Sequence, residues 1–343
     1  MLVEGTTERR SNMGRPSEML RIASGGHHFL GVKLTGDALY ASGTDLRADV
    51  VKTKEVPLRS HDVDDVVSQI AAVAAEFSAE LPALTAIGLS LAGVIRKVPA
   101  PLTVMESAFL GWNAVPLTEL VTAATGLPSF ADNDVQALTS AEHLFGSRPG
   151  LDSMVLLTVG AGIGCGVISN GRLVEGAHGI PGRVSHLPVD AGGPLCGLGH
   201  RGCAASYLVN ESIVGALGLP DTRDGYRTAL ERAHAGEPAA VRVVADAGTA
   251  LGVIIGTVAN MNDPQKILVT GEGLPLYNIA TRQVREGIAR VYEDDPAYID
   301  LEVQPFDFDE WARSAAALAI RSMLTETGPK MIGTAQLSAG HSQ

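Results

Sequence analysis

The side chains of this chain that could carry chemistry gather after position 132. Asn133 and Asp134 form an amide–carboxylate pair, which could bind hydroxyl groups and accept a proton. A glycine-rich turn (residues 160–164) follows, with Gly160, Gly162 and Gly164 at alternate positions. Backbone N–H groups in such turns commonly bind phosphate. The alternative for the pair is structural, because asparagine and aspartate after a strand also begin helices as N-caps.

A second group of donors lies in the run from position 176 to 203. His186, Cys196 and Cys203 are the donor types of a zinc knuckle, and His200 could supply a fourth ligand if the loop adjusts. Structural zinc is almost always four-coordinate. The run therefore predicts either a zinc site on these residues or a glycine-rich loop with two free thiols.

The composition limits the possible functions. A chain of 343 residues is long enough for about two domains. Its net charge of −12 argues against nucleic-acid binding by the main body, and its three cysteines do not make a disulfide framework. The uncharged run 247–262 has 16 residues, fewer than the roughly 20 that a membrane span needs. We expect a cytoplasmic protein that does not bind membranes.

The predicted elements place these residues at strand ends. A strand hairpin is expected over 29–57, and a helix follows with Asp62 as its N-cap. A buried strand over 84–94 ends in a glycine turn at Gly93, and a strand over 129–132 delivers the Asn133–Asp134 pair. The strand–turn–strand pattern then restarts at 154–174, with a hairpin turn at Asn170-Gly171. Further elements are expected as helices over 117–125, 135–145, 204–217, 224–234, 237–262, 276–292 and 309–325, and a strand over 266–270.

Taken in order, these motifs resemble the ROK family (repressors, open reading frames and kinases) over residues 14–326. The matching pieces are Gly111-Trp112-Asn113, Asn133-Asp134, the stretch 159–166, the run 176–203, Asn262-Asp263-Pro264 and Gly271-Glu272-Gly273. The resemblance implies a duplicated α/β fold that is actin-like and hexokinase-like (ribonuclease H-like), with a cleft between two halves.

The implied halves are residues 26–140 and 141–308, with a knuckle-like loop at 186–203. The helix at about 309–326 is expected to pack back on the first half. Residues 1–25 are interpreted as a linker, the remnant of a junction with a DNA-binding domain, and 328–343 as a disordered tail.

The resemblance also implies roles for individual residues. In ROK sugar kinases the aspartate of the pair is the general base, a role that Asp134 would have only if this chain is a kinase. The ligand-binding residues implied are Gly93, Asn113, Asn133, Asp134, Arg183 and His186. Gly160, Gly162 and Gly164 would form a phosphate loop, and His186, Cys196 and Cys203, with His200 as the further candidate, would bind zinc.

Several positions depart from the family pattern. Lys33 stands where kinases of the family have the aspartate that organises Mg²⁺, and Ala161 replaces a threonine in the glycine-rich turn. Arg183 and Ala205 replace two glutamates that hold sugar hydroxyls, and Leu198 replaces a cysteine of the knuckle. ATP and Mg²⁺ are therefore not expected as cofactors.

These departures favour the non-catalytic, sugar-sensing and dimerisation body of a ROK-type transcriptional regulator. The alternatives are an ATP-dependent, glucokinase-like sugar kinase with an atypical site and a scaffold without ligand. Residues 13–22 resemble the junction that follows the winged helix-turn-helix of ROK repressors, so DNA contact is expected only through a missing N-terminal domain. A homodimer is expected from the family.

The ligand is expected to be a sugar or sugar derivative, and two substitutions favour an anionic one. Arg183 and Lys33 would bring two positive charges to one cleft, and a guanidinium matches phosphate or carboxylate. The alternative is that Arg183 turns outward or pairs with Asp190.

Overall fold

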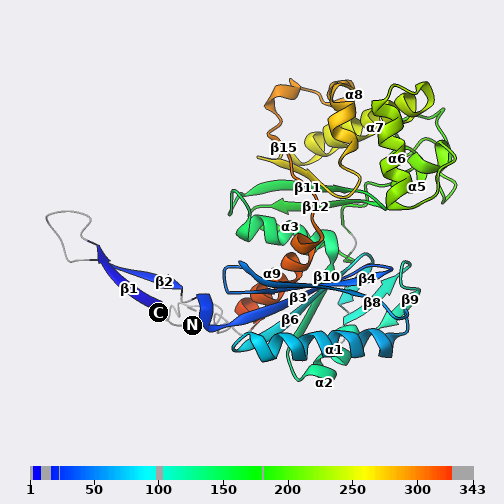
Figure 1. Ribbon diagram of the computed structural model, residues 1–343. Coiled ribbons are helices and arrows are strands. Elements are labelled where there is room, and N and C mark those ends of the chain that lie inside the picture. The colour runs from blue at the N-terminus through cyan, green and yellow to red at the C-terminus, as the bar shows by residue number, and fades with distance from the viewer. Residues whose placement is uncertain (1–2, 9–16, 23, 98–102, 180, 327–343) are drawn as a thin grey trace, which may run out of the picture.

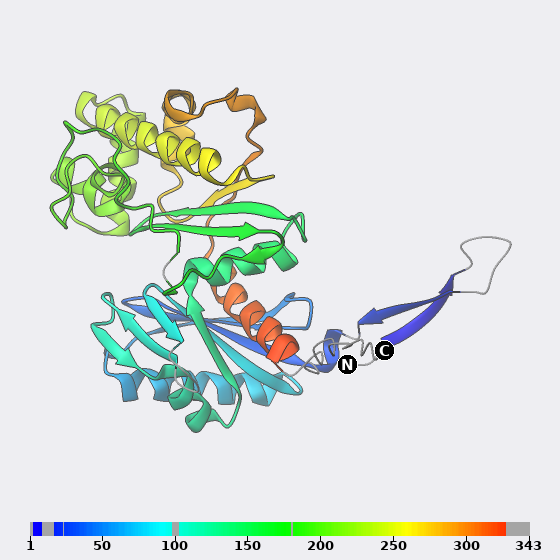
Figure 2. The same ribbon diagram turned by 180° about the vertical axis from the view of Figure 1, so that it is seen from behind.

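The computed structural model of the protein describes residues 3–8, 17–22, 24–97, 103–179 and 181–326. Two lobes, each containing a five-stranded sheet, lie one above the other in Figure 1. Helices α3 (Asp134–Phe145) and α9 (Phe308–Glu326) lie between the two sheets in both views (Figures 1 and 2). Because α3 packs on the sheet of the second lobe and α9 on that of the first, the lobes meet through these two helices.

The sheet of the first lobe combines a three-stranded antiparallel meander with two parallel strands. Its strands, in spatial order, are β10 (Ser129–Asn133), β6 (Leu84–Leu91), β3 (His28–Leu34), β4 (Ala38–Thr44) and β5 (Val50–Pro57). Strands β3, β4 and β5 are antiparallel neighbours, whereas β6 is parallel to β3 and β10 is parallel to β6. Helices α1 (Val63–Glu80) and α2 (Leu117–Thr125) lie on the face opposite α9 (Figure 1).

The sheet of the second lobe repeats this connectivity. Its strands, in spatial order, are β13 (Arg172–Leu173), β12 (Ile163–Ser169), β11 (Ser153–Val159), β14 (Ile267–Thr270) and β15 (Leu301–Val303). Here β11, β12 and β13 form the antiparallel meander, and β14 and then β15 add in parallel. The duplicated α/β architecture predicted from the repeated sequence pattern is confirmed.

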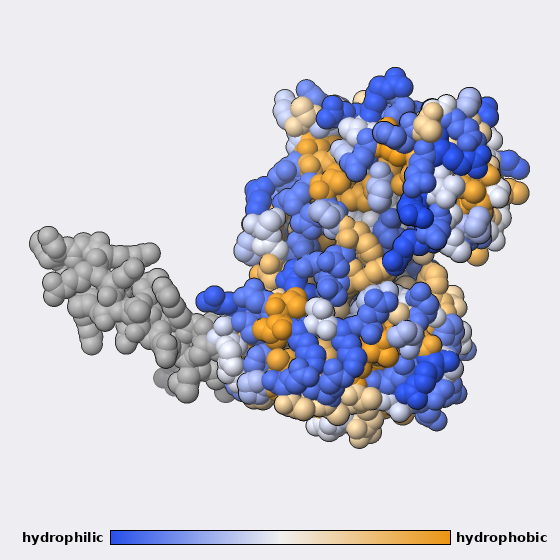
Figure 3. Space-filling model, in the orientation of Figure 1, coloured by the Kyte–Doolittle hydropathy of each residue, from blue (hydrophilic) through white to orange (hydrophobic). Residues whose placement is uncertain are grey.

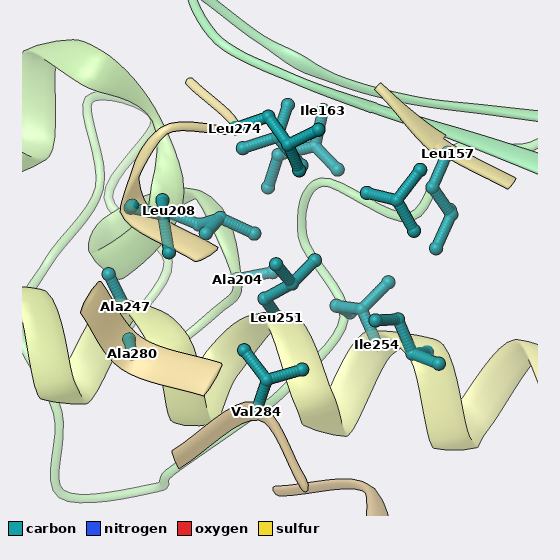
Figure 4. Close-up of a cluster of buried hydrophobic side chains, with 14 of the residues drawn as sticks. Leu157, Ile163, Ala204, Leu208, Ala247, Leu251, Ile254, Leu274, Ala280 and Val284 are labelled. Carbon is teal, nitrogen blue, oxygen red and sulfur yellow. The ribbon is translucent and has the colours of Figure 1, made fainter. Parts of the chain in front are cut away.

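The helices of the second lobe surround its main core. They are α4 (Ala205–Leu208), α5 (Asn210–Ala216), α6 (Arg223–His234), α7 (Pro238–Asn262) and α8 (Leu276–Val291). Figure 4 shows Leu251 and Ile254 of α7 among buried side chains such as Leu157 and Val284. Helix α7 is long and apolar enough to cross a membrane, but most of its apolar stretch is buried in this core. A Cβ at Gly252 would lie 2.1 Å from the carbonyl oxygen of Val284 in α8, so the glycines of α7 allow close helix packing.

Local signals determine several element boundaries. Asp62 accepts hydrogen bonds from the backbone N–H groups of Asp64 and Asp65 as the N-cap of α1. Gly126 ends α2 in the left-handed conformation. Asn170 and Gly171, with φ of 52° and 68°, turn β12 into β13, as the hairpin prediction required.

Some elements differ from the sequence-based prediction. Strands β7 (Val94–Lys97), β8 (Thr103–Ser107) and β9 (Trp112–Val115) form a small antiparallel sheet that was not predicted. In the region interpreted as a linker, β1 (Val3–Glu8) pairs with β2 (Ser17–Ile22). Short 3₁₀ turns occur at Ser24–Gly26 and Pro296–Tyr298. The expected helix 204–217 is divided into α4 and α5, and the tail 328–343 lies outside the described residues.

Candidate functional site

A cleft of about 470 Å³ opens where the two lobes meet. Its walls come from the ends of β3 and β10, the glycine-rich turn between β11 and β12, the segment 181–185 and the start of α9. The waist between the lobes is visible at the right of Figure 3. Of the predicted site residues, Gly93, Asn133, Asp134 and Arg183 line this cleft, together with the three glycines of the turn.

Asn133 is the N-cap of α3. Its side-chain oxygen accepts hydrogen bonds from the N–H groups of Val135 and Gln136, at 3.0 and 3.3 Å. Its amide nitrogen donates to the carbonyl of Gly93 at 3.0 Å. The structural alternative for Asn133 is therefore realised, and one amide hydrogen remains for a ligand.

Lys33 of β3 forms a buried ion pair with Asp134 at the start of α3. Only 5% of the Lys33 side chain and 9% of the Asp134 side chain are exposed. The second carboxylate oxygen of Asp134 accepts the N–H of Val135 at 2.9 Å, and the Lys33 ammonium lies 4.7 Å from the ring centroid of Trp311. The positive charge of Lys33 is thus compensated within the protein. Lys33 is therefore not the free cation on which the expectation of an anionic ligand partly depended.

Two predicted ligand residues lie away from the cleft walls. Asn113 is exposed on β9, and His186 is exposed on the knuckle loop. Arg183 does line the cleft, is exposed, and has no ion pair within the described residues. Asp190, its suggested partner, instead accepts hydrogen bonds from the N–H of Gly192 and the hydroxyl of Tyr207.

The glycine-rich turn is occupied by a carboxylate of the protein. The N–H of Ala161 donates to a side-chain oxygen of Glu272 at 2.7 Å. A Cβ at Gly160 would lie 2.3 Å from the carboxyl carbon of Glu272, so only glycine allows this approach. Glu272 therefore lies where a bound phosphate would accept a hydrogen bond from the same N–H group.

A larger groove, about 1210 Å³, adjoins the cleft and shares Ala161 and Glu272 with it. Carboxylates outnumber cations in its lining. The acidic residues are Glu55, Glu211, Asp221, Glu272, Asp307 and Asp309, and the basic residues are Lys54 and Arg223. The excess of carboxylates opposes the binding of a polyphosphate.

An aromatic cluster lies between the cleft and this groove. Tyr40 stacks on Phe308 with ring centroids 4.4 Å apart, and Phe306 packs edge-on against Phe308 at 4.6 Å. The guanidinium of Arg223, from the second lobe, lies 5.7 Å from the ring centroid of Phe308. Phe306 also contacts Trp311, which extends the cluster to Lys33. The cluster joins the two lobes beside the buried ion pair.

The knuckle loop (residues 186–203) brings all four candidate metal ligands together. The ligand atoms of His186, Cys196, His200 and Cys203 lie within 4.8 Å of one another. Nδ1 of His186 is 3.5 Å from the sulfur of Cys203 and 3.7 Å from that of Cys196. Tetrahedral zinc with its usual bonds to nitrogen and sulfur separates its ligands by about 3.6 Å. The donor set and its spacing therefore fit zinc, and the ligand atom of His200 already lies with the other three.

The backbone of the knuckle loop explains this geometry. The N–H of Cys196 donates to the carbonyl of His200 at 2.9 Å, which closes a tight turn between two ligands. Gly202 has φ of 61°, and a Cβ there would lie 1.5 Å from the carbonyl oxygen of Asp190. Burial and the neighbouring His200 hold the pKa of His186 below its ordinary value, which favours the neutral imidazole that metals bind. Leu198, at a family cysteine position, is 73% exposed.

Sequence reasoning missed the carboxylate of Glu272, the buried amide of Gln136 and the aromatic cluster. Glu272 lies in the Gly271-Glu272-Gly273 motif, whose match to the family implied no role for its carboxylate. Phe306, Phe308 and Trp311 lie close together in a chain whose aromatic content is only 4%, and this local density is a signal that could have predicted the cluster.

The third cysteine, Cys165, lies in β12, where burial raises its pKa to about 12.

Comparisons with known proteins agree with this architecture. A protein-family model described as the ROK family matches residues 29–321. The xylose repressor of Bacillus spizizenii is 23% identical over 288 residues, which cover 82% of this chain and 74% of the repressor. The N-acetylmannosamine kinase of Citrobacter koseri is 30% identical over 297 residues, covering 84% of this chain and 98% of the kinase.

Among solved structures, a ROK family transcriptional regulator that is a homolog of the E. coli MLC protein superposes with a TM-score of 0.75. It is 26% identical, and the match covers 92% of this chain and 84% of the regulator. The duplicated lobes are thus the actin-like, hexokinase-like fold that regulators and sugar kinases share. The chain belongs to the ROK family.

Proposed function

We propose that this chain is the sugar-sensing body of a ROK-type transcriptional regulator, which binds a sugar in the cleft and does not phosphorylate it. The observation that carries the proposal is the buried ion pair between Lys33 and Asp134. A general base must contact the hydroxyl proton that it removes. In this chain one oxygen of Asp134 contacts an ammonium and the other accepts a backbone N–H.

The nucleotide end of the site supports the same proposal. Phosphoryl transfer depends on positive groups and metal ions around the transferred phosphate. Here Glu272 accepts the N–H of the glycine-rich turn, and the adjoining groove is mainly acidic. Carboxylates at these positions would repel ATP rather than hold it.

A sugar kinase remains the second candidate function. Asp134 and the glycine-rich turn line one cleft, as a kinase would require, and one relative is named as an N-acetylmannosamine kinase. For this function Lys33 would have to leave Asp134 when substrate binds.

Further parts of the proposal concern metal and partners. We propose that His186, Cys196, His200 and Cys203 hold a structural zinc ion that keeps the knuckle loop in place. With a net charge of −12, the chain has little electrostatic attraction for DNA, so in the proposed regulator DNA would be recognised by a separate DNA-binding domain. Homodimer formation and a cytoplasmic location complete the proposed regulator.

A thermal-shift screen against hexoses, pentoses, amino sugars and their phosphates tests the proposed function. A ligand that binds only the folded state raises the melting temperature, by an amount that grows with its concentration. We expect at least one sugar to do so. No shift with any sugar at millimolar concentration would contradict a sensing role.

The charge of the ligand should depend on Arg183. We expect gluconate or a hexose 6-phosphate to bind about tenfold more tightly than the neutral hexose, because a charge-assisted hydrogen bond contributes about 1.5 kcal/mol. Arg183→Gln should remove this preference, whereas Arg172→Gln, on exposed β13 outside the cleft lining, should not. Calorimetric titration measures both. Tighter binding of neutral sugars that is unaffected by Arg183→Gln would show that the arginine does not select the ligand.

Removing the carboxylate of Glu272 should create weak anion binding. In Glu272→Ala the N–H of Ala161 loses its acceptor and a like charge disappears, so we expect inorganic pyrophosphate to bind at least about tenfold more tightly than to the unmodified chain. Glu211→Ala is the matched control, because Glu211 lines the same groove and its side chain has no hydrogen bond to the turn among the described residues. Titration at low salt would refute this interpretation if both variants behave like the unmodified chain.

A further inference from the structure

A second cavity adjoins the sugar end of the cleft. Its volume is about 350 Å³, and its wall includes Ile95, Arg96, Leu173, Glu175 and His178. Gln136, Gly179 and Pro181 line both this cavity and the cleft. The two spaces therefore share one wall, and a ligand that passes from one to the other would contact these three residues.

Gln136 brings an unpartnered polar group to this shared wall. It lies in the first turn of α3, two residues after Asp134, and is only 6% exposed. Its side-chain oxygen is buried and accepts no hydrogen bond from the described residues. Buried polar atoms without a partner are uncommon in folded proteins, and each one requires an explanation. The oxygen is covered in this structure, and because Gln136 lines both cavities, a rotation of its amide would bring the oxygen to a ligand atom.

The chemistry of the wall indicates what that ligand atom is. A glutamine amide can accept one hydrogen bond and donate others, as a sugar hydroxyl also does. The surrounding Arg96, Glu175 and His178 are polar, which suits a hydroxylated group better than an alkyl chain. Sites for whole small ligands begin at about 300 Å³. A cavity of 350 Å³ is therefore large enough for a second sugar ring and larger than a methyl or acetyl substituent needs.

We propose that the cleft and the second cavity together bind a disaccharide, one ring in each, and that Gln136 hydrogen-bonds a hydroxyl group near the linkage. The inference rests on the proposed function, because the first ring occupies the proposed sugar site. Gln136 is then the residue that distinguishes a two-ring ligand from a monosaccharide.

Calorimetric titration of the full chain with matched pairs of sugars tests this assignment. The pairs are maltose and glucose, sucrose and glucose, trehalose and glucose, and trehalose 6-phosphate and glucose 6-phosphate. We expect at least one disaccharide to bind about tenfold more tightly than its monosaccharide. Gln136→Met should weaken the disaccharide by about five- to tenfold, since one hydrogen bond is lost, and should change the monosaccharide less than twofold.

Stability measurements separate a ligand contact from a structural role. Gln136→Met removes an unpartnered atom, so its melting temperature should equal or exceed that of the unmodified chain. Gln69 is the matched control: it is also buried, but it accepts from the N–H of Arg59 and donates to the carbonyl of Pro57. Gln69→Met should therefore lower the melting temperature and leave sugar affinity unchanged.

Two results would overturn the inference and leave the proposed function standing. One is tight binding of monosaccharides with no gain for any disaccharide. The other is an equal loss of both affinities in Gln136→Met. If no sugar of either size binds, the proposed function fails as well.

Discussion

Replacing Lys33 with methionine is expected to lower the free energy of unfolding by about 3–5 kcal/mol. The substitution keeps an unbranched side chain, one atom shorter, and removes its charge, so Asp134 loses its ion-pair partner at a site where 9% of its side chain is exposed. Of the two partners of the Asp134 carboxylate described above, only the N–H of Val135 would remain. Urea denaturation monitored by circular dichroism measures the change.

A double variant and a second lysine complete this experiment. In Lys33→Met/Asp134→Asn the buried charge is gone, so most of the lost stability should return. Lys266 is the matched control, because its side chain is also 5% exposed but its partner Glu302 is 34% exposed and can be hydrated. Lys266→Met should cost only about 1–2 kcal/mol. If both lysine variants lost the same free energy of unfolding and the double variant recovered none of it, the Lys33–Asp134 pair would contribute no more to stability than the Lys266–Glu302 pair.

Removal of zinc should have the second large effect. We expect about one zinc per chain in protein purified without chelator, and a melting temperature at least about 5 °C lower after chelation. His200→Ala should lower the metal content below about 0.2 per chain, because three donors leave the tetrahedral site incomplete.

Leu198→Ala is the matched control for the knuckle loop. Leu198 lies two residues from both Cys196 and His200 and is 73% exposed, so it should change neither metal content nor melting temperature. Folded protein that lacks zinc and resists chelation would contradict a metal site on these residues. Retention of zinc by His200→Ala would instead exclude His200 as a ligand.

Features with local causes were predictable from the sequence. The N-cap at Asp62, the stop at Gly126 and the turn at Asn170-Gly171 each depend on residues within one turn of chain. The duplicated fold followed because the strand–turn–strand pattern occurs twice. The small sheet β7–β8–β9 was missed because its strands have only four or five residues, too few for a clear alternation.

Contacts over long sequence distances were not predictable in the same way. Family resemblance assigned Lys33 to the metal-organising position and Asp134 to the base, but nothing in either motif indicated that the two, 101 residues apart, would pair. The contact between Ala161 and Glu272 spans 111 residues and closes only when the second lobe folds. The sequence indicated His200 as a candidate ligand but not its position, because that position depends on a turn closed by the hydrogen bond from the Cys196 N–H to the His200 carbonyl.

The most direct test of the account is ADP release with Mg-ATP and the sugar that gives the largest thermal shift, at a sugar concentration that saturates binding. We predict sugar binding with no ADP above the level of Asp134→Asn, because the ion pair with Lys33 occupies the carboxylate that would act as the base. Sugar-dependent ADP release at about 1 s⁻¹ or faster, the lower end of ordinary enzyme rates, and its loss in Asp134→Asn would contradict it.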